Sequence, residues 1–466
     1  MRDQHGLEMT GAGAAVRRYD RAVNELLHFR GEMLTDAGEA AREDPGSPMA
    51  AALNAFLRLL STEPADAADA ARVIAEFRAA APGRRFTARE EAHLRAADAW
   101  IAGDMHAAGR VLRAISREHP RDALALSVGH QIDFFTGDAL SLRDRVAEAA
   151  SAWPDGDPHR GPVLGMLAFG LEEAGDYERA EETGRRAVEL DPADVWGIHA
   201  VSHSFEMRAR ARDGIRYLDE RRAAWAQDTA LTVHNWWHRA LFSLELGDLA
   251  DVLETYDARI HHAESAGLAL EMLDGAALLW RLWLEGSDQS ARWRALAERW
   301  GPQVDAPFYA FNDVHAVMAW VGAGDVARAE RLVADRERYL AEPRGGASNY
   351  AMTARIGLPA CRAAIAFARG RHAEVADLLY PIRHHLNEFG GSHAQRDVLH
   401  RTLLESALRA DRHELAGRLV RERLHLKPDS PYNWRKRADL HRAIGNPAAA
   451  AEDDRRATEL AAAGRR

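Results

Sequence analysis

The stretch GPVLGMLAFGLEEAGDYERAEETGRRAVELDP, at residues 161–192, determines the predicted fold. Two segments with apolar residues at helical spacing flank a Gly-Asp pair at Gly175, and small residues recur at Ala168 and Ala180. Small residues allow two helices to approach closely, glycine permits the turn between them, and a proline such as Pro192 ends the second helix. The stretch therefore predicts a pair of antiparallel helices.

The same turn signal recurs along the chain and is typical of tetratricopeptide repeats. Gly-Asp pairs that separate two amphipathic patterns also begin at Gly103, Gly137, Gly247 and Gly324. We expect an all-α fold, a right-handed superhelix of about nine to ten helical hairpins. It is predicted to be one continuous solenoid over residues 1–466, with N-terminal hairpins at 1–160, central repeats at 161–325, and C-terminal and capping hairpins at 326–466.

Composition excludes several classes of function. The formal net charge of -10 argues against a broad nucleic-acid interface. The only lysines are Lys427 and Lys436, which leaves little material for lysine-based covalent catalysis. The single cysteine, Cys361, excludes intramolecular disulfides and cysteine-rich metal sites, and we expect it in the core. Without a signal-peptide core or a long apolar segment, the chain is predicted to be cytoplasmic, with no membrane partner.

Two histidine pairs mark residues 195–238, VWGIHAVSHSFEMRARARDGIRYLDERRAAWAQDTALTVHNWWH. His199 and His203 are four residues apart, as are His234 and His238, and Glu206 follows His203 by three. Residues at these spacings lie on one face of a helix. The pairs are one hairpin apart, and the first helix of each hairpin lines the inner surface of such a superhelix. We therefore expect the two pairs to converge.

Three interpretations of the histidines remain open. They can form hydrogen bonds within a repeat core, bind a metal ion, or form a metal-free polar or acid–base site. Two histidines from each of two neighbouring helices, with the carboxylates Glu206 and Asp274, suit Zn²⁺ or a non-haem iron or manganese ion. Glu206 or Asp274 would then be a ligand or the base that acts on bound water. His315, on a following inner helix, is a further candidate catalytic residue.

Four other residues are candidates for substrate binding, each with a structural alternative. Trp237 can wall off a dry pocket or pack between repeats, and Asn235 can orient a substrate or cap a loop. In GGSHAQRDV, Arg396 and Asp397 can meet a small polar ligand. The alternative is a simple helix start, with a capping box formed by Ser392 and Gln395.

Several segments resemble the tetratricopeptide repeat protein 38 family over residues 19–423. They are LAFGLEEAGDYERAEETGRRAVELDPADVWGIHAVSHSFEM, VHNWWHRALFSLELGD, LDGAALLWRLWLEG, FNDVHAVMAW and GGSHAQRDVLHRTLLESAL. The resemblance implies a helical-repeat fold and the same inner polar residues, but no particular reaction. Family members are closer to HAVAHVLEM where this chain has Ser202, Ser204 and Phe205. The three polar positions of that motif are kept.

Two functions are predicted from different classes. The first is a small-molecule enzyme with its site in a concave pocket, assisted by a divalent metal ion in a hydrolysis or an oxidation. The alternative is a non-catalytic scaffold that binds a peptide or protein partner in its groove. The inner helices are rich in tryptophan and histidine, and apolar rings are costly to expose, which favours an enclosed pocket. We therefore expect later repeats to close over the histidines, with Arg396 or Asp397 in the same cavity. The oligomeric state is left open.

Overall fold

The chain is folded almost entirely into α-helices. The computed structural model describes residues 1–343 and 345–463, so residue 344 and the last three residues of the predicted capping hairpins lie outside the described residues. Within the described ranges there is no β-strand, only two isolated bridges, Arg2 with Glu8 and Arg30 with Thr229. No helix in this part of the chain combines the length and the apolar character needed to cross a bilayer.

The helices follow one another in chain order. The first eight are α1 (Gly13–Leu27), α2 (Met33–Glu43), α3 (Pro48–Leu59), α4 (Pro64–Ala80), α5 (Ala88–Ile101), α6 (Met105–Glu118), α7 (Ala123–Phe135) and α8 (Ala139–Ala149). The central ones are α9 (Arg160–Glu173), α10 (Tyr177–Leu190), α11 (Val195–Met207), α12 (Ala211–Glu220), α13 (Arg222–Trp225), α14 (Thr232–Glu245), α15 (Leu249–Thr255), α16 (Ala269–Leu284), α17 (Ser290–Arg299), α18 (Ala310–Gly322) and α19 (Val326–Ala341). The last are α20 (Ser348–Met352), α21 (Leu358–Ala368), α22 (His372–Leu379), α23 (His393–Arg409), α24 (His413–Leu426), α25 (Pro431–Ala443) and α26 (Pro447–Ala462).

Short 3₁₀ or π segments complete the list: η1 (Ala150–Ala152), η2 (Tyr256–Ile260), η3 (Pro302–Val304), η4 (Thr353–Gly357) and η5 (Leu386–Phe389).

Consecutive helices pack as antiparallel hairpins, which confirms the predicted all-α solenoid. Over the described residues there are twelve hairpins, from α1–α2 to α25–α26, rather than nine to ten. The expected number was too low because the first two hairpins lack the glycine signal. Phe29 and Thr62 take the left-handed conformation in those turns, at φ 54° and 62°, where most later turns use glycine, with Ala209 and Asp411 as exceptions.

The inner helices are buried on all sides and form the core. Every residue of α11 from Val195 to Phe205 is buried, because α11 lies between α9, α10, α14 and α23. Cys361 on α21 is also buried, as expected. Polar side chains on such helices must find partners inside the protein, since a buried polar group without a partner is unfavourable. The histidines of α11 can therefore find partners only inside the protein.

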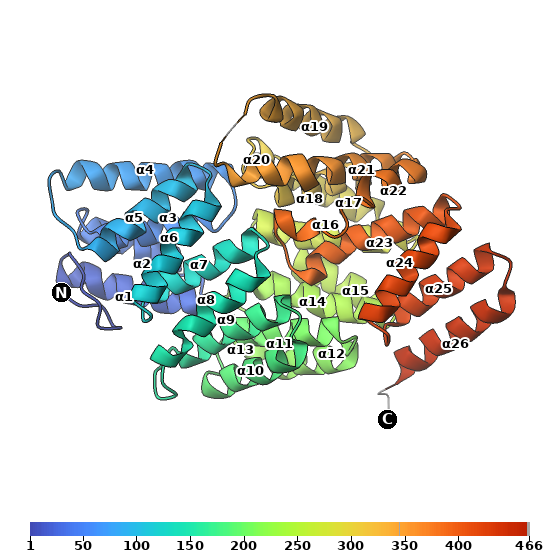
Figure 1. Cartoon of the computed structure of the whole chain (residues 1–466), viewed down its shortest axis with the longest axis horizontal. Helices are drawn as coiled ribbons and strands as arrows, with labels where there is room; N and C mark the ends of the chain where they lie inside the picture. The colour runs from blue at the N-terminus through green and yellow to red at the C-terminus, as the bar shows by residue number, and fades with distance from the viewer. Residues whose placement is uncertain (344, 464–466) are drawn as a thin grey trace.

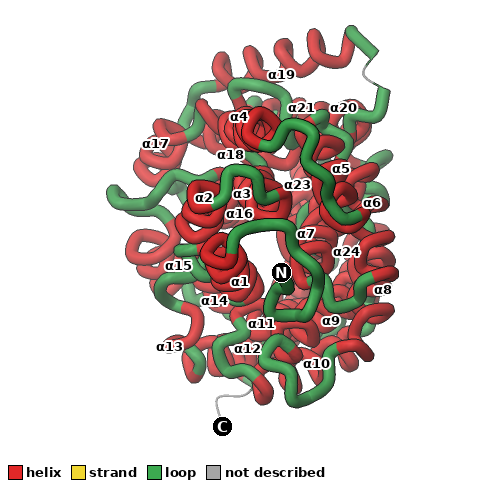
Figure 2. Tube along the Cα trace, turned by 90° about the vertical axis from the view of Figure 1, so that its left-hand side faces the viewer, coloured by secondary structure: helices red, strands yellow, loops and turns green. Residues whose placement is uncertain are grey.

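Later repeats close over the histidine helices, as expected (Figures 1 and 2). α23 packs against both α11 and α16. The first hairpins also reach the second half of the chain: the Asn312 side chain donates to the carbonyl of Thr62 at 3.0 Å, and the Ser348 amide donates to the carbonyl of Gly103 at 2.9 Å. This closure removes the large aromatic rings from water, and Trp280 is fully buried.

The predicted start of α23 is confirmed and positions the site. Ser392 accepts the backbone N–H of Gln395, and the Gln395 side chain accepts the N–H of Ser392, which completes the capping box. The same motif starts α5 at Thr87.

Candidate metal centre

Helices α11 and α14 bring the four predicted histidines together. One ring nitrogen from each of His199, His203, His234 and His238 lies within 4.8 Å of the others. The Nε2 atoms of His199 and His203 are 2.9 Å apart, and the rings of His203 and His238 have centroids 4.4 Å apart. Two pairs at four-residue spacing, on helices packed side by side, therefore produce one cluster.

The cluster is largely buried, and several of its ring nitrogens have no hydrogen-bond partner. His203 and His238 are fully buried, and His234 has 15% of its side chain exposed. Neither ring nitrogen of His238 has a hydrogen-bond partner, and the Nδ1 of His199 also lacks one. Burial, reinforced by the neighbouring rings, lowers the pKa of His199, His203 and His238 well below the ordinary value. Neutral imidazole is the form that binds metal ions.

A carboxylate faces three of the four imidazoles. Asp274 on α16 is 2.8 Å from the Nδ1 of His234. Glu172 on α9 is 3.6 Å from the Nδ1 of His203, and Glu206 on α11 is 3.9 Å from the Nδ1 of His238. Such carboxylates commonly fix the ring orientation of metal-binding histidines. Burial raises the pKa of Asp274.

Glu206 also faces a small internal space. The Nζ of Lys427 is 3.8 Å from its Oε1. Both residues line a cavity of about 20 Å³ between α11, α14 and the α24–α25 connection. About 10–15 Å³ is enough to hold one water molecule. Glu206 therefore borders the cluster on one side and a water-sized space on the other.

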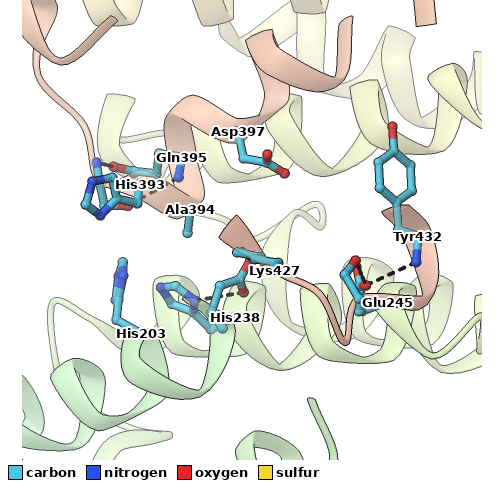
Figure 3. Close-up of polar contacts among 12 residues, drawn as sticks. His203, His238, Glu245, His393, Ala394, Gln395, Asp397, Lys427 and Tyr432 are labelled. Atoms are coloured by element: carbon cyan, nitrogen blue, oxygen red, sulfur yellow. Dashed lines mark hydrogen bonds and ion pairs between the residues drawn. The ribbon is translucent and has the colours of Figure 1, made fainter. Parts of the chain in front are cut away.

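The first turn of α23 covers the histidine cluster. Figure 3 shows His203 and His238 pointing toward this turn, with His393 above His203. Gln395 lies close enough to Asp274 to influence its pKa. Gln395 and Asp274 are 121 positions apart, 395 minus 274, so their proximity depends on the curvature of the whole solenoid. Closure therefore completes the surroundings of the cluster.

Three other predicted residues have internal positions. Trp237 is fully buried and stacks on His234, with ring centroids 5.2 Å apart, so it forms part of the wall. Asn235 is fully buried, and neither its amide nitrogen nor its oxygen has a partner. His315 donates from Nδ1 to the carbonyl of Phe311 on its own helix, while its Nε2 is unpartnered. Its role as a catalytic residue stays a prediction.

Arg396 and Asp397 are both engaged by other side chains of the protein. Arg396 donates to Glu173 at 3.1 Å and to the carbonyl of Gly391. Asp397 accepts from Arg401 at 2.6 Å and from Arg423 at 2.7 Å. Although burial opposes it, these guanidinium groups hold the pKa of Asp397 well below its usual range. To bind a substrate, as predicted, Arg396 and Asp397 would have to replace these contacts with contacts to the ligand.

Sequence reasoning missed three residues near the cluster, Glu172, Glu173 and His393. The signal for the first two was a pair of acidic residues at inner, buried positions just before the Gly175 turn. Burial and the neighbouring Glu173 raise the pKa of Glu172. No comparable signal marked His393, which was interpreted only as part of a capping box.

No family model matches the chain. Its architecture is similar to that of the human IFIT1 dimer with m7Gppp-AAAA, at 14% identity and a TM-score of 0.36, over 97% of this chain and 91% of that one. It is also similar to Naa15/Naa10 bound to HypK-THB, at 10% identity and a TM-score of 0.25, over 96% and 63% of the two chains. The chain is similar as well to the APC/C hetero-tetramer Cut9-Hcn1, at 10% identity and a TM-score of 0.28, over 96% of this chain and 93% of that one.

The fold is a tetratricopeptide-type helical repeat. The hairpins and their Gly-Asp turns establish this class, and membership of the tetratricopeptide repeat protein 38 family stays a prediction.

One prediction concerns His130, which supports the wall of the cluster. Its Nε2 accepts the indole N–H of Trp196 at 3.1 Å, and Trp196 packs on His199. Burial lowers the pKa of His130 to about 3. Below pH about 6.5 the unfolded chain binds a proton at this histidine, whereas the folded chain does not. The free energy of unfolding therefore falls as the pH is lowered from about 6.5. The loss is about 2 kcal/mol at pH 5.

We expect His130→Gln to reduce this acid sensitivity, since the amide oxygen keeps an acceptor for Trp196 but does not titrate. Urea unfolding at pH 7.5 and pH 5 measures the effect. His106→Gln, at an exposed position on α6, is the control and should keep the wild-type slope. Identical pH slopes for wild type and His130→Gln would contradict the argument.

Proposed function

We propose that the chain binds a divalent transition-metal ion through the four-histidine cluster and uses it in a reaction of a small molecule. The observation that carries the proposal is the state of His238. Both of its ring nitrogens are buried without a partner, within reach of three other imidazoles. Buried polar atoms in native proteins nearly always have partners, and a shared metal ion would supply one.

The chemistry of the donors limits the choice of ion. Neutral imidazoles favour zinc or iron, and nearby carboxylates also suit manganese. Ligand atoms that lie about 2.0–2.2 Å from one ion are about 3–3.5 Å apart. The 2.9 Å between the Nε2 atoms of His199 and His203 requires only a small separation to reach this range.

Metal-assisted hydrolysis is the reaction class that we favour. A bound ion lowers the pKa of a coordinated water molecule. The Oε2 of Glu206 has no hydrogen-bond partner and faces His238, so it is placed to take a proton from water at the cluster. Asp274 orients His234, whose partial exposure offers a route from solvent to the ion.

His234→Ala tests the proposal. This change should remove one equivalent of bound metal, because it deletes a ligand from a set of four. Asp274→Asn should weaken binding about 10–100-fold through the orientation of His234. Purified protein, stripped with chelator and dialysed against Zn²⁺, Fe²⁺ or Mn²⁺, is measured by elemental analysis.

His262→Ala, at an exposed position beyond α15, is the matched control and should keep the wild-type metal content. Circular dichroism melting checks that each variant is folded. The proposal is wrong if the wild type binds none of these ions, or if His234→Ala binds as much as wild type.

A non-catalytic scaffold that binds a protein partner is the second candidate function. An outer pocket of about 620 Å³ between α22 and α24 favours it, lined by aromatic and charged side chains that include Tyr380, Arg412 and Arg418. This pocket contains none of the predicted site residues. A chain that binds no metal would leave this candidate as the stronger one.

A further inference from the structure

A second group of metal-ligating side chains adjoins the four-histidine cluster. Glu172 and Glu173 end α9, and His393 begins α23. One ligand atom from each lies within 4.8 Å of the other two. None of the three is a ligand in the proposed centre, so the group needs its own explanation.

Glu172 is the residue that points to a ligand. Its side chain is fully buried, and neither carboxylate oxygen has a hydrogen-bond partner. Its Oε1 lies 3.7 Å from the Nδ1 of His393, and its Oε2 lies 3.6 Å from the Nδ1 of His203. A buried carboxylate without donors is strongly unfavourable, and a bound proton or a bound cation would each relieve the cost.

The partners of Glu173 and His393 show which charges surround the two buried carboxylates. Glu173 accepts the backbone N–H of His393 at 2.8 Å and the guanidinium of Arg396 at 3.1 Å. Arg396 is therefore the only permanently charged cation among these groups, beside two buried carboxylates and the titratable imidazole of His393. The Nδ1 of His393 has no hydrogen-bond partner, and 31% of its side chain is exposed. A cation here could exchange with solvent and keep a water ligand.

The distances fit ligands around an ion better than a direct hydrogen-bonded pair. The Nδ1 of His393 is 3.6 Å from Glu173 and 3.7 Å from Glu172, which is beyond the usual 2.7–3.2 Å of a hydrogen bond. Ligand atoms that share one ion at about 2.0–2.2 Å are about 3–3.5 Å apart. A small inward movement would therefore form the site.

We propose that Glu172, Glu173 and His393 hold a second divalent cation, so that the chain carries two metal sites linked by Glu172. The Oε1 of Glu172 binds the second ion, while its Oε2 faces the imidazole of His203 in the first site. Two carboxylates and one imidazole suit Mn²⁺, Fe²⁺ or Zn²⁺. The second site uses different ligands from the first, so either can be filled without the other.

The test counts Mn²⁺ ions per chain in the full-length protein by equilibrium dialysis and elemental analysis. Wild type should bind two ions, His393→Ala one, and the His234→Ala/His393→Ala double variant none. Glu172→Gln, which preserves shape, should also lose the second ion and provides a folded variant if His393→Ala is unstable. His385→Ala, at an exposed position before α23, is the control and should bind two.

Electron paramagnetic resonance of the Mn²⁺ protein adds a readout of proximity. Two neighbouring Mn²⁺ ions should broaden each other's signals through dipolar coupling in wild type, whereas His393→Ala should give the spectrum of an isolated ion.

The possible outcomes separate the two proposals. One ion in wild type, retained in His393→Ala and Glu172→Gln, overturns the second site and leaves the four-histidine centre. One ion lost in His393→Ala but retained in His234→Ala supports the second site and overturns the first. Two ions without coupling would overturn the link through Glu172.

Discussion

Gly390→Ala is expected to destabilise the chain by about 2–5 kcal/mol, the sum of a left-handed backbone cost and overpacking. Gly390 has φ 86° in the turn before α23. A Cβ atom there would overlap the hydroxyl of Tyr309 and the carbonyl oxygen of Phe135. Both belong to other repeats, so the turn cannot move without loosening the closure. His393 would then lose its position above His203.

Gly370→Ala separates these two costs. Gly370 also has a positive φ, 68°, but a Cβ atom there would meet nothing within 4 Å. Gly370→Ala should therefore lose only the about 1–2 kcal/mol that a positive φ costs a residue with a Cβ atom. Urea unfolding of both variants and wild type measures the difference. Equal losses would show that close packing at Gly390 does not hold the repeats together.

Asp397→Asn should lower the free energy of unfolding by a similar amount, about 3–5 kcal/mol. Asp397 joins Arg401 of its own helix to Arg423 of α24, and only 14% of its side chain is exposed. The neutral amide removes the carboxylate that pairs with Arg423, and it removes the nearest of three carboxylates around Arg401, which keeps Glu245 at 3.3 Å and Glu285 at 3.8 Å. Wild type should lose this stabilisation as the pH falls below about 4, since the folded pKa of Asp397 lies below that of the unfolded chain.

Asp377→Asn is the matched control for Asp397. Asp377 also accepts two hydrogen bonds from one arginine, Arg412, but 67% of its side chain is exposed. Exposed ion pairs contribute little to stability, so we expect little change. Unfolding measured at pH 7 tests the pair. A small effect of Asp397→Asn would instead indicate that Asp397 is available for a ligand.

These two predictions change the interpretation of the segment GGSHAQRDV. It was predicted to present Arg396 or Asp397 to a substrate. The contacts of both residues hold α23 against its neighbours, and their role in substrate binding stays a prediction. The first turn of α23 reaches the cluster through Gln395 and His393, beside Asp274 and Glu172. The segment closes the solenoid and also supplies residues to the surroundings of the cluster.

The sequence by itself determined the repeat class and the convergence of the four histidines. Both depend on short-range rules: Gly-Asp turns define the hairpins, and a spacing of four places His199 beside His203 and His234 beside His238 on one helix face. The hairpin interval then places the two helices side by side. The first two hairpins escaped the same rules because non-glycine residues occupy their turns.

Only the tertiary structure decided how far the solenoid closes and which distant residues meet the histidines. Contacts such as that of Glu172 with His393 join residues 221 positions apart, 393 minus 172. Each repeat adds a small rotation, and the sum over many repeats sets which helices face one another. No local pattern encodes that sum. The histidine pairs, Glu206 and Asp274 were therefore predictable, whereas Glu172, Glu173 and His393 were not.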